Sequence, residues 1–292
     1  MTISELLQES KLKLGDQEPD FLGVELLIAY VLGRDREYLV AHGDERFSED
    51  ALVTFQELFG RFYAGEPVAY LINRKEFYGL DFFVDKRVLV PRPETELLVD
   101  KVLDFVRSAN GGSATGSGAA ALKILDIGTG SGCIAVALAK NITEARITAV
   151  DVSVDALQVA KLNAERHDVA DRVSFLESDL LAGVEGVFDV VVANLPYIGE
   201  ERHRYISREA YEYEPHVALF GGSDGLRLYA ALFEQLSRKG WKPKILLGEF
   251  GFLQGDEMRE LLNKFFTHEQ WEIQKDYASI ERTFVVRCTE LT

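Results

Sequence analysis

The sequence predicts an α/β fold in which a doubly wound, mostly parallel sheet follows a small all-helical N-terminal domain and a linking β-hairpin. After residue 121, short apolar runs alternate with segments whose apolar residues recur at helical spacing, as in βαβ units. The first 72 residues show helical spacing only. Between these parts, aromatic and β-branched residues surround a glycine, as in a hairpin.

The composition is that of an ordinary globular protein. Its 292 residues suffice for one large or two modest domains, and 47% of them are hydrophobic. The net charge of −16 argues against a protein that mainly grips phosphate backbones, because such proteins need basic patches. Cys133 and Cys288 match no metal or redox spacing and suit a reducing, cytoplasmic location. We expect no signal peptide and no membrane span, since no apolar run approaches the roughly 20 residues that cross a bilayer.

Residues 1–73 are predicted to form the helical domain. Asp20 can cap a helix over residues 21–32. Ser48, followed by two acids, starts a second helix, and Pro67 opens a short third one. No catalytic constellation occurs here, so this domain is interpreted either as a substrate-docking domain or as a structural cap.

Residues 74–90 are predicted to be a hairpin that links two domains, with its turn at Gly79. The larger domain is expected to cover residues 91–292 and to begin with a helix, because Pro93 and the neighbouring carboxylates suit a helix N-terminus. Residues 109–121 are rich in glycine, serine and alanine, which favours a flexible surface loop.

Seven strands alternate with helices in the larger domain. The predicted strands are 122–127, 146–150, 173–176, 187–193, 244–249, 271–275 and 283–288. The predicted helices between them are 132–140, 154–167, 225–239 and 254–266. In open α/β sheets ligands bind beyond the carboxyl ends of the strands, so the residues that follow these strands are the candidate site.

A glycine-rich loop follows the first of these strands. Its residues are Asp126-Ile127-Gly128-Thr129-Gly130-Ser131-Gly132, one residue short of the dinucleotide-binding spacing. Asp126 can attract a cationic ligand amine and would repel a pyrophosphate. Asp151 ends the second strand, at the distance from which an acid reaches ribose hydroxyls, and Asp179 follows the third, where an adenine edge could be read. The arrangement resembles class I methyltransferases, whose cofactor S-adenosylmethionine carries an amine, a ribose and an adenine but no phosphate.

The fourth strand ends in Asn194-Leu195-Pro196-Tyr197. This run resembles the Asn/Asp-Pro-Pro-Tyr/Phe pattern of methyltransferases that modify planar nitrogens, which are poor nucleophiles because their lone pair is delocalised. If the N–H groups of such a nitrogen donate to the Asn194 oxygen and to a backbone carbonyl, its lone pair faces the methyl donor. That is catalysis by orientation and electrostatics, without a strong general base. Tyr197 can pack on the planar group; an ordinary turn after a strand is the alternative interpretation.

Further segments make the resemblance specific. The chain is similar, over nearly its whole length, to the HemK/PrmC family of glutamine N5-methyltransferases that act on class I peptide chain release factors. The most selective segment is Pro91-Arg92-Pro93-Glu94-Thr95-Glu96. The other segments that carry the similarity are 65–71, 77–80, 88–90, 126–132, 213–215, 218–226, 249–251, Asp276 and Arg282.

The resemblance implies a seven-stranded class I S-adenosylmethionine-dependent methyltransferase domain. The expected reaction is methyl transfer to the side-chain amide nitrogen of the glutamine in the Gly-Gly-Gln motif of a release factor, with S-adenosylhomocysteine as product. A cytoplasmic monomer is expected, with no metal, no membrane contact and no direct nucleic-acid contact. The implied cofactor-binding residues are Asp126, Ile127, Gly128, Thr129, Gly130, Asp151, Asp179, Leu180 and Asn194. The implied substrate-binding residues are Asn194, Leu195, Pro196 and Tyr197, of which Asn194, Pro196 and Tyr197 are the catalytic candidates.

Two positions depart from the family pattern. Asn73 and Arg74 stand where the family usually has a glycine, and Leu195 stands where it has proline. Asn-Leu-Pro-Tyr resembles the version in ribosomal RNA adenine dimethyltransferases. Because position 195 supplies a backbone carbonyl, and Pro196 still restrains it to extended conformations, we expect activity to be retained.

Three alternatives are left open by the residues. A glutamine of a ribosomal protein, or the N6 nitrogen of adenine in nucleic acid, would use the same chemistry. The acidic net charge argues against the nucleic acid, and the run 91–96 argues against the ribosomal-protein substrate. The third alternative is a non-catalytic cofactor-binding module, which the intact motif residues oppose.

Overall fold

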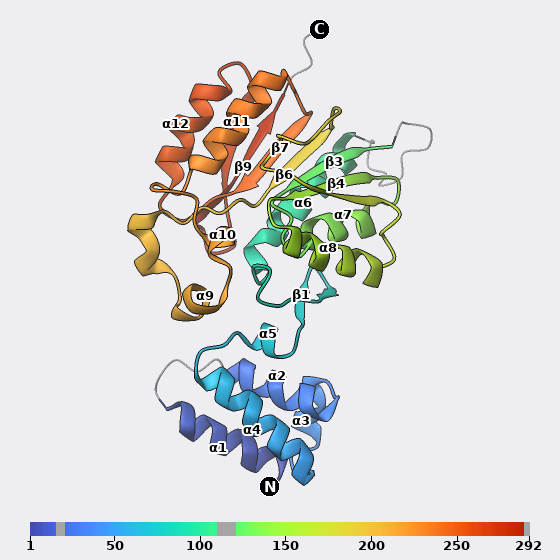
Figure 1. Cartoon of the computed structure of the whole chain (residues 1–292), viewed down its shortest axis with the longest axis vertical. Helices are drawn as coiled ribbons and strands as arrows, with labels where there is room; N and C mark the ends of the chain where they lie inside the picture. The colour runs from blue at the N-terminus through green and yellow to red at the C-terminus, as the bar shows by residue number, and fades with distance from the viewer. Residues whose placement is uncertain (16–20, 110–120, 289–292) are drawn as a thin grey trace. The chain divides into compact units, whose positions relative to one another are not determined.

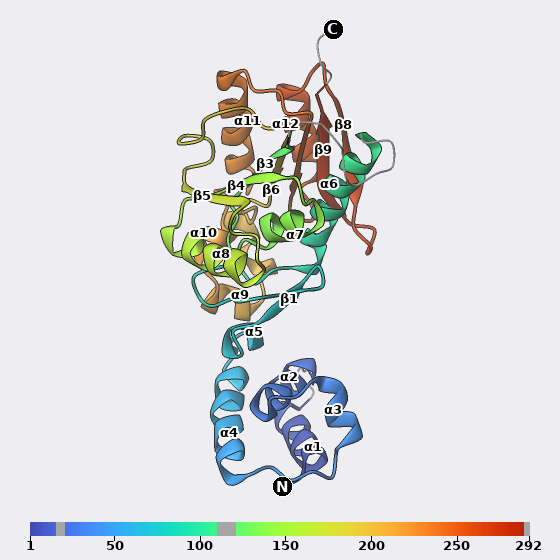
Figure 2. The ribbon, with the colours of Figure 1, turned by 90° about the vertical axis from the view of Figure 1, so that its right-hand side faces the viewer.

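The computed structural model describes residues 1–15, 21–109 and 121–288, and the chain divides into two compact units. One unit comprises Met1–Arg74 and Ser207–Tyr213, and the other comprises Lys75–Ile206 and Glu214–Thr292 (Figure 1 and Figure 2). None of the described helices combines the length and the apolar character that crossing a bilayer requires. The cap predicted at Asp20 lies outside the described ranges, as does nearly all of the loop predicted at 109–121.

The smaller unit consists of helices around an apolar core that includes Ile3, Val24 and Phe55. Ser48 accepts the N–H of Ala51 and so begins its longest helix, as predicted. The predicted helix over residues 21–32 is also present, whereas α1, α3 and α9 were not predicted. The helices of this unit are α1 (Ile3–Leu14), α2 (Phe21–Leu32), α3 (Arg36–Ala41), α4 (Glu49–Tyr63), α5 (Val68–Leu71) and α9 (Arg208–Tyr213).

The larger unit begins with the hairpin β1 (Lys75–Phe77) and β2 (Leu80–Phe82), which turns through Tyr78 and Gly79 with φ angles of 53° and 70°. Strand pairing ends there, so residues 88–90 are not a strand, although they were expected to continue the β structure. The prolines at 91 and 93 lack the N–H groups that a strand ladder requires. A short 3₁₀ helix, η1 (Pro93–Thr95), and α6 (Glu96–Ala109) follow, in agreement with the predicted helix start.

The core of this unit is a seven-stranded sheet of order β5-β4-β3-β6-β7-β9-β8. All neighbouring strands are parallel except β9, which is antiparallel to both of its neighbours. The strands are β3 (Lys123–Ile127), β4 (Arg146–Asp151), β5 (Val173–Glu177), β6 (Val190–Ala193), β7 (Ile245–Glu249), β8 (Gln270–Lys275) and β9 (Glu281–Arg287). The prediction of a doubly wound, mostly parallel sheet of seven strands is confirmed.

Helices cover both faces of the sheet (Figure 1 and Figure 2). On one face lie α6, α7 (Cys133–Asn141) and α8 (Val154–Arg166), and on the other lie α11 (Arg227–Lys239) and α12 (Gly255–Phe265). Alternate strand residues, such as Leu125 and Val191, join the core that α11 and α12 complete. Both faces of the inner parallel strands β3, β6 and β7 are therefore buried, which explains their largely apolar sequence.

The order of the strands reverses between β3 and β6, which are neighbours although β4 and β5 separate them in the chain. Ligands bind at such a switch point, outside the carboxyl ends of the strands. Ile127 lies opposite Ala193 in the register, so the glycine loop after β3 and Asn194 after β6 emerge side by side. Two segments farther along the chain, η2 (Glu200–Tyr205) and α10 (His216–Leu219), also lie in this unit.

Candidate active site

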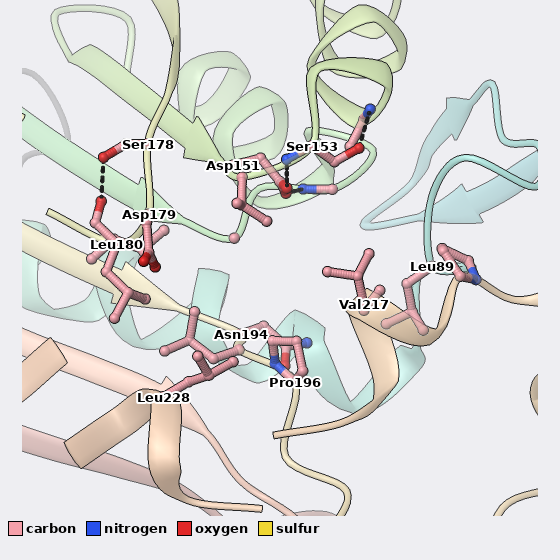
Figure 3. A pocket seen from close by; sticks show the side chains of 18 of the residues that line it. Leu89, Asp151, Ser153, Ser178, Asp179, Leu180, Asn194, Pro196, Val217 and Leu228 are labelled. Carbon is pink, nitrogen blue, oxygen red and sulfur yellow. Dashed lines mark hydrogen bonds between the residues drawn. The ribbon is translucent and has the colours of Figure 1, made fainter. Parts of the chain in front are cut away.

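A pocket of about 480 Å³ lies at the carboxyl ends of β3, β4 and β6 (Figure 3). Apolar side chains such as Val217 and Leu228 line it together with polar groups from the predicted motifs. The predicted site residues that line it are Ile127, Gly128, Gly130, Asp151, Asp179, Leu180, Asn194, Leu195 and Pro196. The predicted residues Asp126, Thr129 and Tyr197 are not among its lining residues.

The glycine loop needs glycine for two separate reasons. Gly128, Gly130 and Gly132 have φ angles of 73°, 55° and 80°, which side chains other than glycine rarely adopt. A Cβ on Gly128 would lie 3.2 Å from Cδ2 of Leu195, and one on Gly132 would lie 3.0 Å from Cβ of Ala160. The loop therefore packs directly against the end of β6 on one side and against α8 on the other.

Asp151 is half-buried and lines the pocket at the end of β4. Its Oδ2 accepts the backbone N–H of Gly130 at 2.9 Å, and its Oδ1 accepts the N–H of Ser153 at 2.9 Å (Figure 3). Burial raises the pKa of Asp151, and these backbone donors oppose that shift. A carboxylate has about four lone-pair positions, so each oxygen can still accept a hydroxyl group from a ligand.

Asp126 is fully buried beneath the glycine loop. Its Oδ2 accepts the hydroxyl of Thr129 at 2.6 Å, while its Oδ1 has no hydrogen-bond partner among the described atoms. Burial raises the pKa of Asp126 to about 7. An unpaired buried carboxylate oxygen is unfavourable, and a cationic donor would satisfy it.

The third predicted acid, Asp179, is exposed at the pocket edge, on the turn that follows β5. The hydroxyl of Ser178 donates to the carbonyl of Leu180 at 2.9 Å (Figure 3). It also accepts the N–H of Gly183 at 3.0 Å. Leu180 has a φ angle of 53°, so its backbone is in the left-handed region. This turn brings both Asp179 and the buried Leu180 to the pocket.

The side chain of Asn194 belongs to a hydrogen-bonded cluster with Thr95, Glu249 and Tyr197. Asn194 Nδ2 donates to Thr95 Oγ1 at 2.9 Å and to Glu249 Oε2 at 3.3 Å. The Thr95 hydroxyl donates to Glu249 Oε2 at 2.7 Å, and the Tyr197 hydroxyl donates to Glu249 Oε1 at 3.0 Å. Burial raises the pKa of Glu249 and, with the neighbouring carboxylate, that of Tyr197.

Thr95 and Glu249 were not predicted as site residues. Both lie in segments that carry the family resemblance, but no role was assigned to either. The sequence contained one signal for Glu249 as a site residue. Glu249 is an acid at the end of a predicted apolar strand, and Asp126 and Asp151 lie within one residue of the ends of two other predicted strands. The register places Ala193 opposite Gly248, so Asn194 and Glu249 follow at the same edge of adjacent strands.

The run 91–96 ties together three distant segments of the larger unit. Arg92 forms an ion pair with the buried Glu214 at 2.6 Å. Thr95 bonds Glu249, as described, and Glu96 accepts the backbone N–H of Tyr78 at 2.9 Å. The run that is most specific to the family pattern thus makes the contacts that hold these segments around the pocket, although it does not line the pocket itself.

Leu195 contributes more than the backbone carbonyl that was expected of it. Its side chain is only 3% exposed and belongs to the core that α11 and α12 complete. Its N–H also donates to the Tyr229 hydroxyl at 3.4 Å. The expectation was incomplete because it considered the peptide group alone and not the packing of the strand end against Gly128.

The segment 221–225 forms a close backbone support beneath the Asn194–Tyr197 turn. A Cβ on Gly221 would lie 2.2 Å from the carbonyl oxygen of Pro196, and one on Gly225 would lie 2.1 Å from that of Tyr197. Gln254 links this segment to the Asn194–Tyr197 turn, because its Nε2 donates to the carbonyl oxygens of Tyr197 at 2.8 Å and of Asp224 at 3.0 Å. Glycine is therefore required by contact at both positions.

The arrangement defines a class I methyltransferase: the sheet order, the glycine loop with acids at neighbouring strand ends, and the Asn194 turn occupy one edge. Two family models match the chain, the Methyltransferase small domain over residues 116–210 and the PrmC N-terminal domain over residues 5–72. Within residues 1–15, 21–109 and 121–288, no three His, Cys, Asp or Glu side chains are grouped so that they could hold a metal ion.

Release factor glutamine methyltransferases are close relatives of this chain over most of its length. The enzyme of that name from Koribacter versatilis is 36% identical over 282 residues, which cover 94% of each chain. The one from Nitratidesulfovibrio vulgaris is 36% identical over 291 residues, covering 98% of this chain and 95% of its own. The chain belongs to the release factor glutamine methyltransferase family, as the sequence motifs indicated.

Solved structures support the fold independently. The catalytic domain of hMettl16, crystallised with the MAT2A 3′UTR hairpin 6, superposes on this chain with a TM-score of 0.57, and the alignment covers 96% of each chain. Its sequence identity to this chain is 14%, so the similarity concerns the fold alone.

Proposed function

We propose that this protein transfers a methyl group from S-adenosylmethionine to the side-chain amide nitrogen of the glutamine in the Gly-Gly-Gln motif of a class I release factor. The observation that carries the proposal is that Asp151 and Asn194 line one pocket, where a methyl donor and an amide acceptor would meet. The names of the relatives supply the release factor as substrate.

The residues around the pocket fit the cofactor. Asp151 keeps free lone pairs toward the pocket and would accept the ribose hydroxyls. Asp126 does not line the pocket and would support the cofactor indirectly, by holding the glycine loop through its bond with Thr129, and Asp179 with Leu180 would lie at the adenine. Ile127, Gly128, Thr129 and Gly130 would form the backbone cradle. The bound sulfonium would supply an electrophilic methyl group.

Asn194 would hold the substrate glutamine. Its Oδ1 would accept one N–H of the glutamine amide, and the Leu195 carbonyl would accept the other. Pro196 keeps Leu195 extended, and the Tyr197 ring, held by its bond to Glu249, would pack on the planar amide. Both N–H bonds would then lie in the plane of the two acceptors, which leaves the nitrogen lone pair facing the methyl donor. No strong base is needed before the transfer.

The remaining assignments follow the same proposal. Residues 1–73 would be a substrate-docking domain, residues 74–90 the linking segment, and residues 91–292 the methyltransferase domain. We propose a cytoplasmic monomer that contacts the release factor and no nucleic acid directly. The acidic net charge of −16 supports the last point, since backbone phosphates would be repelled.

The proposal is tested with purified protein and S-adenosylmethionine that carries a labelled methyl group. A class I release factor is expected to take up the label, and the same factor with Gln→Ala in its Gly-Gly-Gln motif is expected to take up none. A ribosomal protein mixture and an adenine-containing oligonucleotide serve as the alternative substrates. No label in the release factor, or equal label in the Gln→Ala factor, would overturn the proposed function.

A further inference from the structure

We propose that Glu249, acting through Thr95, is a positioning residue that fixes which end of the Asn194 amide faces the substrate. This inference rests on the proposed function, because it concerns the atom that accepts the glutamine N–H. Glu249 is 1% exposed and does not line the pocket, so it acts through Asn194 and not on the substrate.

The direction of each hydrogen bond in the cluster follows from chemistry. Burial raises the pKa of Glu249, but the hydrogen bonds that it accepts from Thr95 and Tyr197 and the charge of Arg282 favour its ionised form. An ionised carboxylate only accepts, so the Thr95 hydroxyl donates its single proton to Glu249 Oε2. Thr95 Oγ1 can then only accept from its other neighbour, Asn194. Asn194 must therefore turn its NH₂ group toward Thr95 and Glu249, which both accept from it. Its Oδ1, the acceptor that a substrate amide needs, is left on the opposite side.

Tyr197 strengthens this orientation from the other oxygen of the same carboxylate. Its hydroxyl donates to Glu249 Oε1 at 3.0 Å, so Glu249 receives three donors, Thr95 from η1 and both Asn194 and Tyr197 from the turn after β6. Glutamine at position 249 has nearly the same shape but one donor and one acceptor end. Its NH₂ group can face Thr95 and Asn194, and the amide of Asn194 is then free to turn over. The flipped amide presents NH₂ to the substrate NH₂, which is repulsive.

The test uses Glu249→Gln, Asn194→Asp and the double variant of both. Glu260→Gln, the same substitution at an exposed glutamate of α12, is the control. Each protein is assayed for kcat and KM on the release factor, for the Kd of S-adenosylhomocysteine, and for the thermal midpoint. Glu249→Gln is expected to lower kcat roughly a hundredfold, because small misplacements of reacting groups have effects of that size. The Kd of S-adenosylhomocysteine and the thermal midpoint should stay near those of Glu260→Gln.

The double variant gives the sharpest outcome. Asn194→Asp alone sets two carboxylates against each other and should be nearly inactive. When Glu249→Gln is added, the hydrogen bonds can reverse: the introduced amide donates to Thr95, Thr95 donates to the new carboxylate, and an acceptor oxygen again faces the pocket. The double variant is therefore expected to recover at least about tenfold in kcat over Asn194→Asp.

Three results would overturn the inference. Glu249→Gln could match the wild type in kcat, the double variant could be no better than Asn194→Asp, or the loss could appear equally in cofactor Kd and thermal midpoint. In each of these cases a wild type that methylates the release factor leaves the proposed function standing. A wild type that methylates no glutamine overturns the proposed function and, with it, the positioning role.

Discussion

Gly128 and Leu195 are in close contact at the edge of the pocket. A Cβ on Gly128 would lie 3.2 Å from Cδ2 of Leu195 and 3.4 Å from the carbonyl oxygen of Asn194. The glycine loop after β3 and the reactive turn after β6 are thus in direct contact, through the Leu195 side chain and the Asn194 carbonyl. This contact couples the loop proposed to hold the cofactor to the residue proposed to hold the substrate.

Gly128→Ala is expected to destabilise the protein more than Gly130→Ala does. Both residues have positive φ, which disfavours alanine by roughly 1–2 kcal/mol, but a Cβ on Gly130 would meet nothing within 4 Å. The additional overpacking at Gly128 should contribute about 1 kcal/mol or more. Urea titrations that give the free energy of unfolding of both variants check this difference, and equal values would contradict the described contact.

Asp151→Ala is expected to weaken the binding of S-adenosylhomocysteine by roughly 10- to 100-fold. A hydrogen bond to a charged group contributes about 1.5–3 kcal/mol, and the variant also removes the acceptor that Gly130 uses. Asp155→Ala removes an exposed carboxylate from the first turn of α8 and serves as the control. Isothermal titration calorimetry measures both; an unchanged Kd for Asp151→Ala would refute the ribose assignment.

Asp126 is expected to make stability fall as pH rises between about 4 and about 7. The pKa of Asp126 is about 7 in the folded protein, against an ordinary value of 3.8, because burial disfavours its charge and nearby Asp151 adds to the shift. In that window the folded state keeps a proton that the unfolded state has lost, so the free energy of unfolding decreases by about 1.4 kcal/mol per pH unit.

Asp126→Asn isolates this effect, because the new amide oxygen can still accept the Thr129 hydroxyl. The free energy of unfolding is measured for both proteins by urea titration at about pH 5 and about pH 7. The advantage of the variant over the wild type should grow with pH. If the two proteins change in parallel, Asp126 does not titrate as described.

Leu195→Pro should remain active, within about tenfold of this protein, because the carbonyl proposed to bind the substrate is retained. Its thermal midpoint should fall, since the core loses part of the buried Leu195 side chain and Tyr229 loses the Leu195 N–H. A methylation assay and a thermal unfolding curve check both statements. A variant at least about a hundredfold more active than this protein would contradict the explanation of why leucine is tolerated.

The inner parallel strands β3, β6 and β7 could be predicted because each is a largely apolar run that ends at a polar or glycine residue, and β4 and β7 lie within a residue of the predicted spans. The helix α1 was missed although its capping box, Thr2 with Glu5, is visible in the sequence. The departure at Asn73 also has a local explanation. Its φ angle is 50°, and asparagine tolerates the left-handed conformation that glycine usually supplies.

The roles of Thr95 and Glu249 could not be predicted in the same way. Their hydrogen bond joins residues 154 positions apart, and only the register of β6 and β7 and the place of η1 bring them together. The burial of Asp126 was equally invisible, since its position before the loop suggested a ligand contact and not a side chain that the loop covers. Local patterns thus identified the motifs, whereas the contacts between motifs required the structure.

The most direct measurement of the central claim is the location of the transferred methyl group by tandem mass spectrometry. A class I release factor is incubated with S-adenosylmethionine and either the wild type or Asn194→Ala, and the peptide that contains Gly-Gly-Gln is fragmented. The wild type should add one methyl group to the glutamine side-chain nitrogen, and Asn194→Ala should lower the rate by roughly 10²- to 10³-fold. A methyl group on another residue, or an Asn194→Ala variant as fast as the wild type, would contradict the account.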